Sequence, residues 1–158
     1  MKGEILTMGK MRFTGRSSKY LFDGAGGKRD QLEQAILSEM DVKQYPLKRT
    51  IKDIKAGGLL FGTKEQCVVI EIDKDAQIII SNNTVGTYLY VELYMMVQEK
   101  SALFAALSAL TDNIFKEQKR NAVFEAAIAA SESAFRKLNL VAANSGYVGQ
   151  RDEISSED

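Results

Sequence analysis

The side chains best suited to chemistry in this chain are basic, and the first of them follow a cluster of glycines. Gly24, Gly26 and Gly27 precede Lys28 and Arg29, where a helix is expected to begin. Backbone N–H groups and the helix dipole favour negative charge at a helix N-terminus, so this loop is a candidate anion site. Its spacing matches neither a Walker A loop nor the Gly-x-Gly-x-x-Gly fingerprint. A surface loop between a strand and a helix explains the same residues without a ligand, and we prefer that interpretation.

A second basic group follows closely. The sequence predicts a short helix over residues 46–56, because the chain's only proline suits the first helical position and a glycine follows the end. In this helix Lys48, Lys52 and Lys55 share one face, and Arg49 can pair with an acid four residues later. A strand is the alternative, although the apolar residues alternate poorly. The basic face is either solvated or a surface that contacts anions.

Three tyrosines could supply stacking. Tyr88, Tyr90 and Tyr94 recur at even spacing within residues 87–97, where the residues between them are mostly aliphatic. This period of two predicts a strand with one tyrosine face, although the aliphatic residues also fit a helix. An exposed tyrosine face can stack on nucleobases, whereas packing under a helix explains the pattern without a ligand. With the basic groups, it gives an alternative function: a binder of nucleic acid or of a phosphorylated small ligand.

Catalytic and metal chemistry have little support. The chain has no histidine and a single cysteine, Cys67. Ser-His-Asp and Cys-His catalysis are therefore excluded within one chain, and a zinc site is disfavoured. The remaining acid–base candidates are Glu71, Asp73, Asp75 and Glu92. Oxygen ligands for a divalent cation are present at Asp73, Asp75, Asn82 and Asn83, but not at EF-hand spacing. We therefore predict no catalytic residue, no metal site and no cofactor.

The chain's largest apolar stretch lies within residues 99–141 and is rich in Ala and Leu, which favour helix. We predict two long helices, at 99–117 and 119–139, with a turn near 111–113; one very long helix is the alternative. Apolar residues recur at helical spacings of three and four within each half: Leu103, Leu107, Leu110, Ile114, Phe124, Ile128, Phe135 and Leu138. This face is either ordinary core or the seam of a homo-oligomer.

The preceding residues predict an antiparallel sheet. Residues 67–72 and 77–80 are rich in β-branched side chains and form the clearest hairpin, about a turn at 73–76. Their apolar runs indicate strands covered on both faces, by helices on one side and by a second subunit on the other. Cys67 is expected to be a small core residue. The other expected elements are a strand at 59–61, a turn formed by residues 81–84 and Gly86, an N-terminal hairpin of strands 3–13 and 19–22 about a turn at 15–18, and a helix capped by Asp30.

Together these elements predict an α+β fold, an antiparallel β-meander of about four to six strands packed with helices, including a C-terminal pair of long helices. Residues 1–141 are expected to form one domain, of which residues 1–98 are mainly sheet. The Gly-, Ser- and acid-rich residues 142–158 are expected to form a disordered tail.

Composition narrows the class of protein. Hydrophobic residues make up 45% and charged residues 27%, as in ordinary globular proteins. No apolar run reaches the ~18–20 residues of a membrane helix. The single cysteine suits a reducing compartment, so we expect a cytoplasmic protein without membrane contact.

Charge is unevenly spread along the chain. Residues 1–64 hold 13 basic and 7 acidic side chains, a net charge of +6, whereas residues 65–158 hold 8 and 14, a net charge of −6. The halves can therefore complement each other, or the first half can meet an anionic partner. We predict a non-enzymatic binding or interaction protein, homo-oligomeric through its C-terminal helices or a sheet face.

Overall fold

The computed structural model describes residues 11–42, 47–55, 64–98, 114–141 and 150–153 of the chain. These residues form a six-stranded antiparallel sheet with two α-helices, in the spatial order β2-β3-β4-β5-β1-β6. The elements are β1 (Met11–Phe22), a 3₁₀ turn (Gly26–Lys28), α1 (Arg29–Val42), β2 (Arg49–Lys55), β3 (Lys64–Asp73), β4 (Ala76–Val85), β5 (Tyr88–Gln98), α3 (Ile114–Lys137) and β6 (Gln150–Glu153). The predicted α+β class and antiparallel meander are confirmed.

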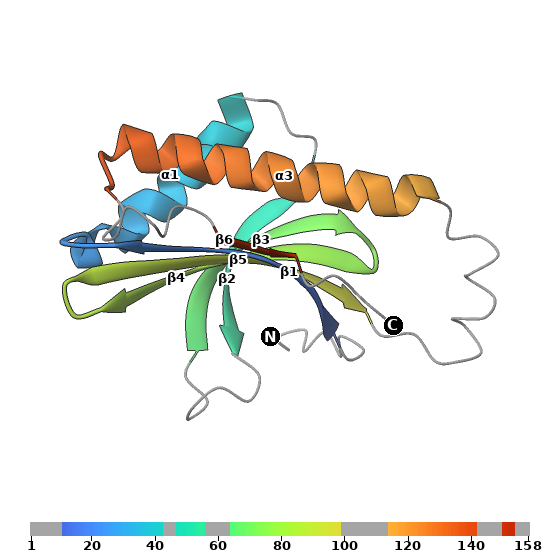
Figure 1. Cartoon of the computed structure of the whole chain (residues 1–158), viewed down its shortest axis with the longest axis horizontal. Coiled ribbons are helices and arrows are strands. Elements are labelled where there is room, and N and C mark those ends of the chain that lie inside the picture. The colour runs from blue at the N-terminus through green and yellow to red at the C-terminus, as the bar shows by residue number, and fades with distance from the viewer. Residues whose placement is uncertain (1–10, 43–46, 56–63, 99–113, 142–149, 154–158) are drawn as a thin grey trace, which may run out of the picture.

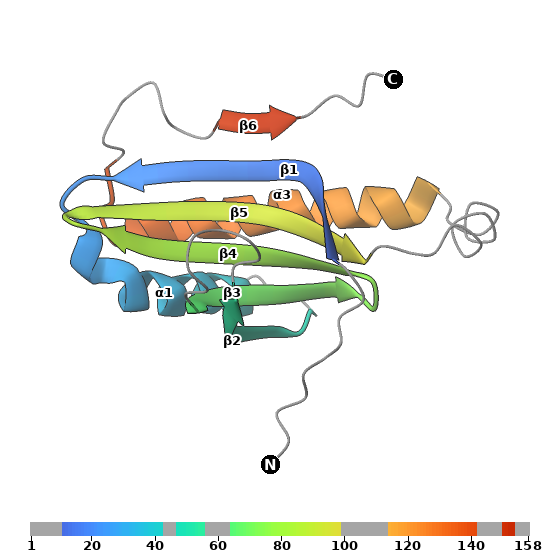
Figure 2. The same ribbon diagram turned by 90° about the horizontal axis from the view of Figure 1, so that it is seen from below.

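Both helices lie on the same face of the sheet (Figure 1). Seen from the opposite face, α3 runs behind β1 and β5, and α1 lies behind β3 and β4 (Figure 2). The core fills the space between these two layers, with Leu32 and Ile36 of α1, Ile128 of α3, and Ile78 and Ile80 of β4 all fully or almost fully buried. No helix in the described ranges is long and apolar enough to cross a membrane.

An aromatic cluster fixes α3 on the sheet. The Phe135 ring of α3 lies 4.8 Å from the Tyr20 ring and 4.7 Å from the Phe22 ring of β1, centroid to centroid. The Tyr20 hydroxyl donates to Glu132 Oε1 at 3.1 Å and accepts from Ser18 Oγ at 3.0 Å. Tyr20 therefore buries its ring while its polar atom is satisfied, as buried tyrosines require.

The predicted strand at residues 87–97 is confirmed as β5, and its helical alternative is wrong. Leu89, Val91 and Leu93 are completely buried on the face toward the helices, while the tyrosines between them point to the other face. On that other face Cys67, Val69 and Ile79 are also buried, although no described helix lies there. The prediction that the central strands are buried on both faces is therefore confirmed.

The predicted helix at residues 46–56 is wrong. Residues 49–55 form β2, which pairs with β3 from Arg49 opposite Ile70 to Lys55 opposite Lys64. The proline and glycine at either end also suit the boundaries of a strand. Pairing with β3 decides between helix and strand, and local sequence signals do not contain that pairing. Arg49 forms an ion pair with Asp41 of α1 and not with Asp53.

Two predicted turns are also wrong. Residues 15–18 lie inside β1, where the register with β5 shifts between Phe13 and Ser17, so Gly15 marks an irregularity in one strand and not a hairpin turn. Residues 81–84 continue β4, so of the predicted turn only Gly86 lies between β4 and β5, where its φ of 60° suits glycine. The Asn82 side chain is buried on the face toward the helices, where packing outweighs its preference for turns.

The predicted C-terminal pair of long helices is wrong. The described residues contain one helix there, α3, which continues without interruption through the break expected at residue 118. The polar residues at 116–121 favour a boundary in the sequence, but in the structure they face solvent or form ion pairs along a continuous helix. The expected turn at 111–113, the helix at 99–113 and the strand at 59–61 lie outside the described residues.

The other end of the chain also differs from expectation. Residues 150–153, within the tail expected to be disordered, form β6 and pair with β1 from Arg16 to Lys19. Helix α1 begins at Arg29, so Asp30 lies in its first turn and not at the N-cap. In the first turn its negative charge still interacts favourably with the helix dipole.

The glycine loop packs against the turn between β4 and β5. Gly26 donates its N–H to the Thr87 carbonyl at 3.0 Å, and its own carbonyl accepts from Thr84 Oγ1 at 2.7 Å. A Cβ atom on Gly26 would lie 2.6 Å from the Gly86 carbonyl oxygen, closer than real side chains approach. The glycine at this position therefore serves close backbone packing.

Replacing Gly26 by alanine should lower the free energy of unfolding by about 1–3 kcal/mol, because two backbone segments must separate. Gly27→Ala is the matched control, since a Cβ there meets no atom within 4 Å. The control should change stability by less than about 0.5 kcal/mol. Urea unfolding of both variants measures the difference; equal stabilities would show that the contact between Gly26 and Gly86 is not a constraint on the fold.

Candidate functional site

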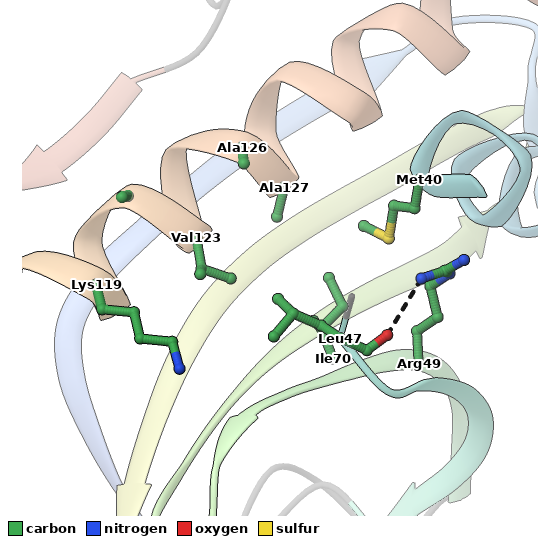
Figure 3. Close-up of a pocket in the computed structure, with 9 residues that line it drawn as sticks. Met40, Leu47, Arg49, Ile70, Lys119, Val123, Ala126 and Ala127 are labelled. Atoms are coloured by element: carbon green, nitrogen blue, oxygen red, sulfur yellow. Dashed lines mark hydrogen bonds between the residues drawn. The ribbon is translucent and has the colours of Figure 1, made fainter. Parts of the chain in front are cut away.

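An apolar pocket of about 260 Å³ opens where the end of α1, the middle of α3 and the strands β2 and β3 meet (Figure 3). Its described lining residues are Met40, Leu47, Arg49, Ile70, Lys119, Ala122, Val123, Ala126 and Ala127. Seven of these nine side chains are apolar, so the pocket can hold an apolar group away from water.

Each wall comes from a different part of the sequence. The five residues that α3 contributes recur at spacings of three and four, so they share one helix face. Met40 lies in the last turn of α1, and Leu47 lies just before β2. Arg49 and Ile70 face each other across β2 and β3. Three of the α3 residues are alanines, whose small side chains leave the space open.

The two charged residues of the pocket are both basic. Arg49 donates from Nη1 to the Leu47 carbonyl at 3.1 Å, and its guanidinium forms an ion pair with Asp41. Lys119 is exposed, and its side chain extends from α3 toward the pocket (Figure 3). Within the described part of the chain no acid forms an ion pair with Lys119.

Ion pairs at both ends of α3 hold this wall in place. Arg120 makes two hydrogen bonds to the Asp73 carboxylate, at 2.9 and 3.1 Å, next to the turn between β3 and β4. Burial acts to raise the pKa of Asp73, but the hydrogen bonds from Arg120 and the Asp75 backbone N–H outweigh it, so the pKa is lowered. At the other end Lys137 pairs with the buried Glu39 of α1.

The predicted anion site does not gather free cations. Lys28 Nζ donates to the Leu138 carbonyl at 3.3 Å, and Arg29 lies 3.4 Å from Asp30 and 3.8 Å from Glu33. Gly24 has a positive φ of 68° and Gly27 is exposed, whereas Gly26 packs against the neighbouring turn. The loop joins β1 to α1 and packs against the turn between β4 and β5.

The second basic group is divided by its strand. Lys48 and Lys52 both approach the Glu71 carboxylate, at 3.9 and 3.7 Å, on the face of the sheet away from the helices. Arg49 points to the opposite face and lines the pocket. Lys55 ends β2, and its side chain lies outside the described part. The structure therefore does not bring the four predicted residues together.

The three tyrosines do share a face, as predicted. Tyr88 is exposed and Tyr90 and Tyr94 are partly buried, and they alternate along β5 with Leu89, Val91 and Leu93, which belong to the core under the helices. Tyr94 packs edge-on against Phe13, with ring centroids 6.3 Å apart. No helix in the described ranges covers this face of β5, and both explanations of the pattern, packing under a helix and stacking on a ligand, stay predictions.

The predicted oligomer seam lies mostly in the core where it is described. Phe124, Ile128 and Phe135 are buried between α3 and the sheet, and Leu138 is partly buried against the same core. Ile114 is the exception, with 73% of its surface exposed beside Phe115 at 76%. Leu103, Leu107 and Leu110 lie outside the described residues.

Acidic and metal-binding candidates are dispersed. Asp73 and Asp75 pair with Arg120 and Lys116 of α3, and Glu71 pairs with the lysines of β2. Within the described ranges no group of three or more potential metal-ligating His, Cys, Asp or Glu side chains lies close together. Cys67 is buried, as expected.

The pocket residues were not predicted as a site. Met40 lies in the helix expected after the glycine loop, whereas Leu47 and Arg49 fall within the predicted helix at residues 46–56, which does not form. The only sequence feature that points to the pocket is the set of alanines at helical spacing in α3. A row of small side chains next to bulky core residues indicates either close packing or open space.

A buried acid lies outside the pocket, under the first half of α1. Glu33 is 1% exposed, and neither of its carboxylate oxygens has a hydrogen-bond partner of good geometry among the described residues. The neighbouring Asn82 amide is fully buried, and together with Gln66 it lies close enough to Glu33 to act against a rise in the pKa of that carboxyl. Burial raises the pKa of Glu33 above its ordinary range, and Arg29 only partly opposes this effect.

No protein-family model, curated protein or solved structure matches this chain.

Glu33→Gln should raise stability above neutral pH by about 1 kcal/mol, because it removes a buried charge and keeps the shape. The folded protein binds the Glu33 proton more tightly than the unfolded chain does. The free energy of unfolding therefore falls as pH rises from the ordinary value of 4.5 through the raised pKa. This contribution to the slope should vanish in the variant.

Urea unfolding between pH 4 and pH 9 measures both effects. Glu117→Gln is the control, since Glu117 is an exposed acid of α3 and its replacement should leave the wild-type pH profile. A Glu33→Gln profile parallel to that of the wild type would contradict the assignment of this pH dependence to Glu33.

Proposed function

We propose that this chain is a non-enzymatic binding protein that holds an apolar group of its ligand in the pocket between α1, α3, β2 and β3. The pocket itself is the observation that carries this proposal, because apolar walls enclose a volume close to the lower end of known ligand sites. Apolar walls offer water no hydrogen bonds, so the transfer of an apolar ligand group from solvent into the pocket is favourable.

The walls are held before any ligand binds. Three ion pairs connect the walls. Arg120 with Asp73 joins α3 to the β3–β4 turn, Lys137 with Glu39 joins α3 to α1, and Arg49 with Asp41 joins β2 to α1. Preformed walls reduce the conformational entropy lost on binding, which raises affinity for a given area of contact. Ion pairs that tie the walls together and a lining that is mostly apolar support a binding role for the site.

Self-association is a second proposed function, supported by a different observation. Ile114 and Phe115 expose most of their apolar surface at the start of α3. Large apolar side chains exposed side by side are typical of surfaces that contact another protein. The proposed partner is a second copy of this chain, packed through the first turn of α3.

A phosphorylated ligand or nucleic acid has weaker support. The basic groups of the glycine loop and of β2 already contact acids or a carbonyl within the chain. An anionic ligand would have to displace these contacts, and its binding would weaken steeply with added salt.

Filling the pocket tests the binding function. Ala126→Phe places a large side chain on the lining and should abolish the shifts that 1-octanol causes in the methyl NMR signals of Val123 and Ala127. Ala129→Phe is the matched control, because Ala129 is exposed on the same helix and does not line the pocket. The control should bind octanol as the wild type does. No octanol-dependent shift at Val123 or Ala127 in the wild type would contradict the proposed function.

Phe115→Ser tests self-association. Light scattering after size exclusion should give a multimer for the wild type and a mass closer to that of one chain for this variant, because apolar burial at the contact is lost. Val85→Ser is the control, since Val85 is also exposed but lies at the turn between β4 and β5. A wild-type protein that elutes as one chain at all concentrations would contradict self-association.

A further inference from the structure

The chemical class of the ligand follows from where polar groups can and cannot lie in the pocket, and this inference rests on the proposed function. Met40, Leu47, Ile70, Val123 and Ala127 offer no charged or hydroxyl group to a bound molecule. A polar atom placed among them would lose its hydrogen bonds to water without replacement, which is costly. The ligand must therefore insert an apolar part and leave its polar end at the opening.

The charges around the opening select the sign of that polar end. Arg49 and Lys119 are the charged residues of the described lining, and both are basic. Arg49 is balanced by Asp41 of α1. Lys119 has no such balance, because no acid in the described ranges forms an ion pair with it.

Two bases of α3 next to Lys119 are matched with acids of the β3–β4 turn. Lys116 lies 3.6 Å from the Asp75 carboxylate, and Arg120 binds Asp73 through two hydrogen bonds. Among the described lining residues, Lys119 is therefore the base whose charge no ion pair matches. The opening is thus electrostatically suited to an anion.

We propose that the pocket binds an amphipathic carboxylate, a straight aliphatic chain that lies among the apolar walls with its carboxylate on the Lys119 ammonium. The volume of 260 Å³ limits the chain. Since one water takes about 30 Å³ in the liquid and a methylene group is of similar size, about eight carbons fit. Ala122 and Ala126 line the pocket along α3 with small side chains, which leave room for the aliphatic chain.

The test compares octanoate with 1-octanol, which have the same chain length and differ in charge. Affinities come from titrations followed by methyl NMR at Val123 and Ala127 of the full chain, at pH 7 and low salt. Octanoate should bind about two- to fivefold more tightly than octanol, the size expected for one partly screened ion pair. Each methylene removed from the acid should weaken binding about fourfold.

Lys119→Met removes the charge and keeps an apolar stem of similar length. It should bring octanoate to the affinity of octanol and leave octanol unchanged. Lys74→Met is the matched control, because Lys74 is exposed in the turn between β3 and β4 and does not line the pocket. Added salt should reduce the affinity for octanoate only, and only while Lys119 is present.

The outcomes separate the two proposals. Equal affinities of the wild type for octanoate and octanol, or an unchanged preference for octanoate in Lys119→Met, overturn the carboxylate assignment while the pocket stays a binding site. If neither compound shifts the lining methyls, the proposed function itself is wrong, and the carboxylate assignment is wrong with it. Should Lys119→Met lose its fold, Lys119→Gln provides the same charge comparison.

Discussion

The burial of α3 on one face of the sheet is the interaction on which the rest of the structure depends. Phe135 packs against Tyr20 and Phe22, and Phe124 and Ile128 continue the same buried row. Aromatic pairs of this kind contribute about 0.5–1.5 kcal/mol each beyond the burial of their area. Because Tyr20 and Phe22 belong to β1, this contact joins the two ends of the chain and completes the core.

The pocket is a consequence of the same packing. Where α3 carries Phe124, Ile128 and Phe135, the space between helix and sheet is filled. On the neighbouring stripe its small residues, Ala122 and Ala126, leave room beside the end of α1 and the edge of β2. The ion pairs of α3 lie outside this stripe, so they can hold the helix in place without polar atoms entering the pocket.

Several elements could be predicted because their signals are local. The hairpin of β3 and β4, the alternation of β5 and the presence of a helix after the glycine loop follow from residues close together in the sequence, and each is predicted correctly. The predicted elements that proved wrong depend on remote neighbours. β2 is a strand because it pairs with β3, and residues 81–84 stay in β4 because Asn82 is buried under the helices. The pocket could not be predicted for the same reason, since its walls come from four elements.

The sequence by itself determined the fold class, the strand character of the central residues and the absence of histidine chemistry. These properties follow from composition and from short-range periodicity, which every residue carries with it. Only the tertiary structure decided which basic side chains are balanced by acids and which side chains border a pocket. Arg49 and Lys119 are 70 positions apart and come together only because α3 packs on the face of the sheet to which the Arg49 side chain of β2 points. Charge balance and cavity shape depend on distances between such remote residues, and a linear pattern does not contain those distances.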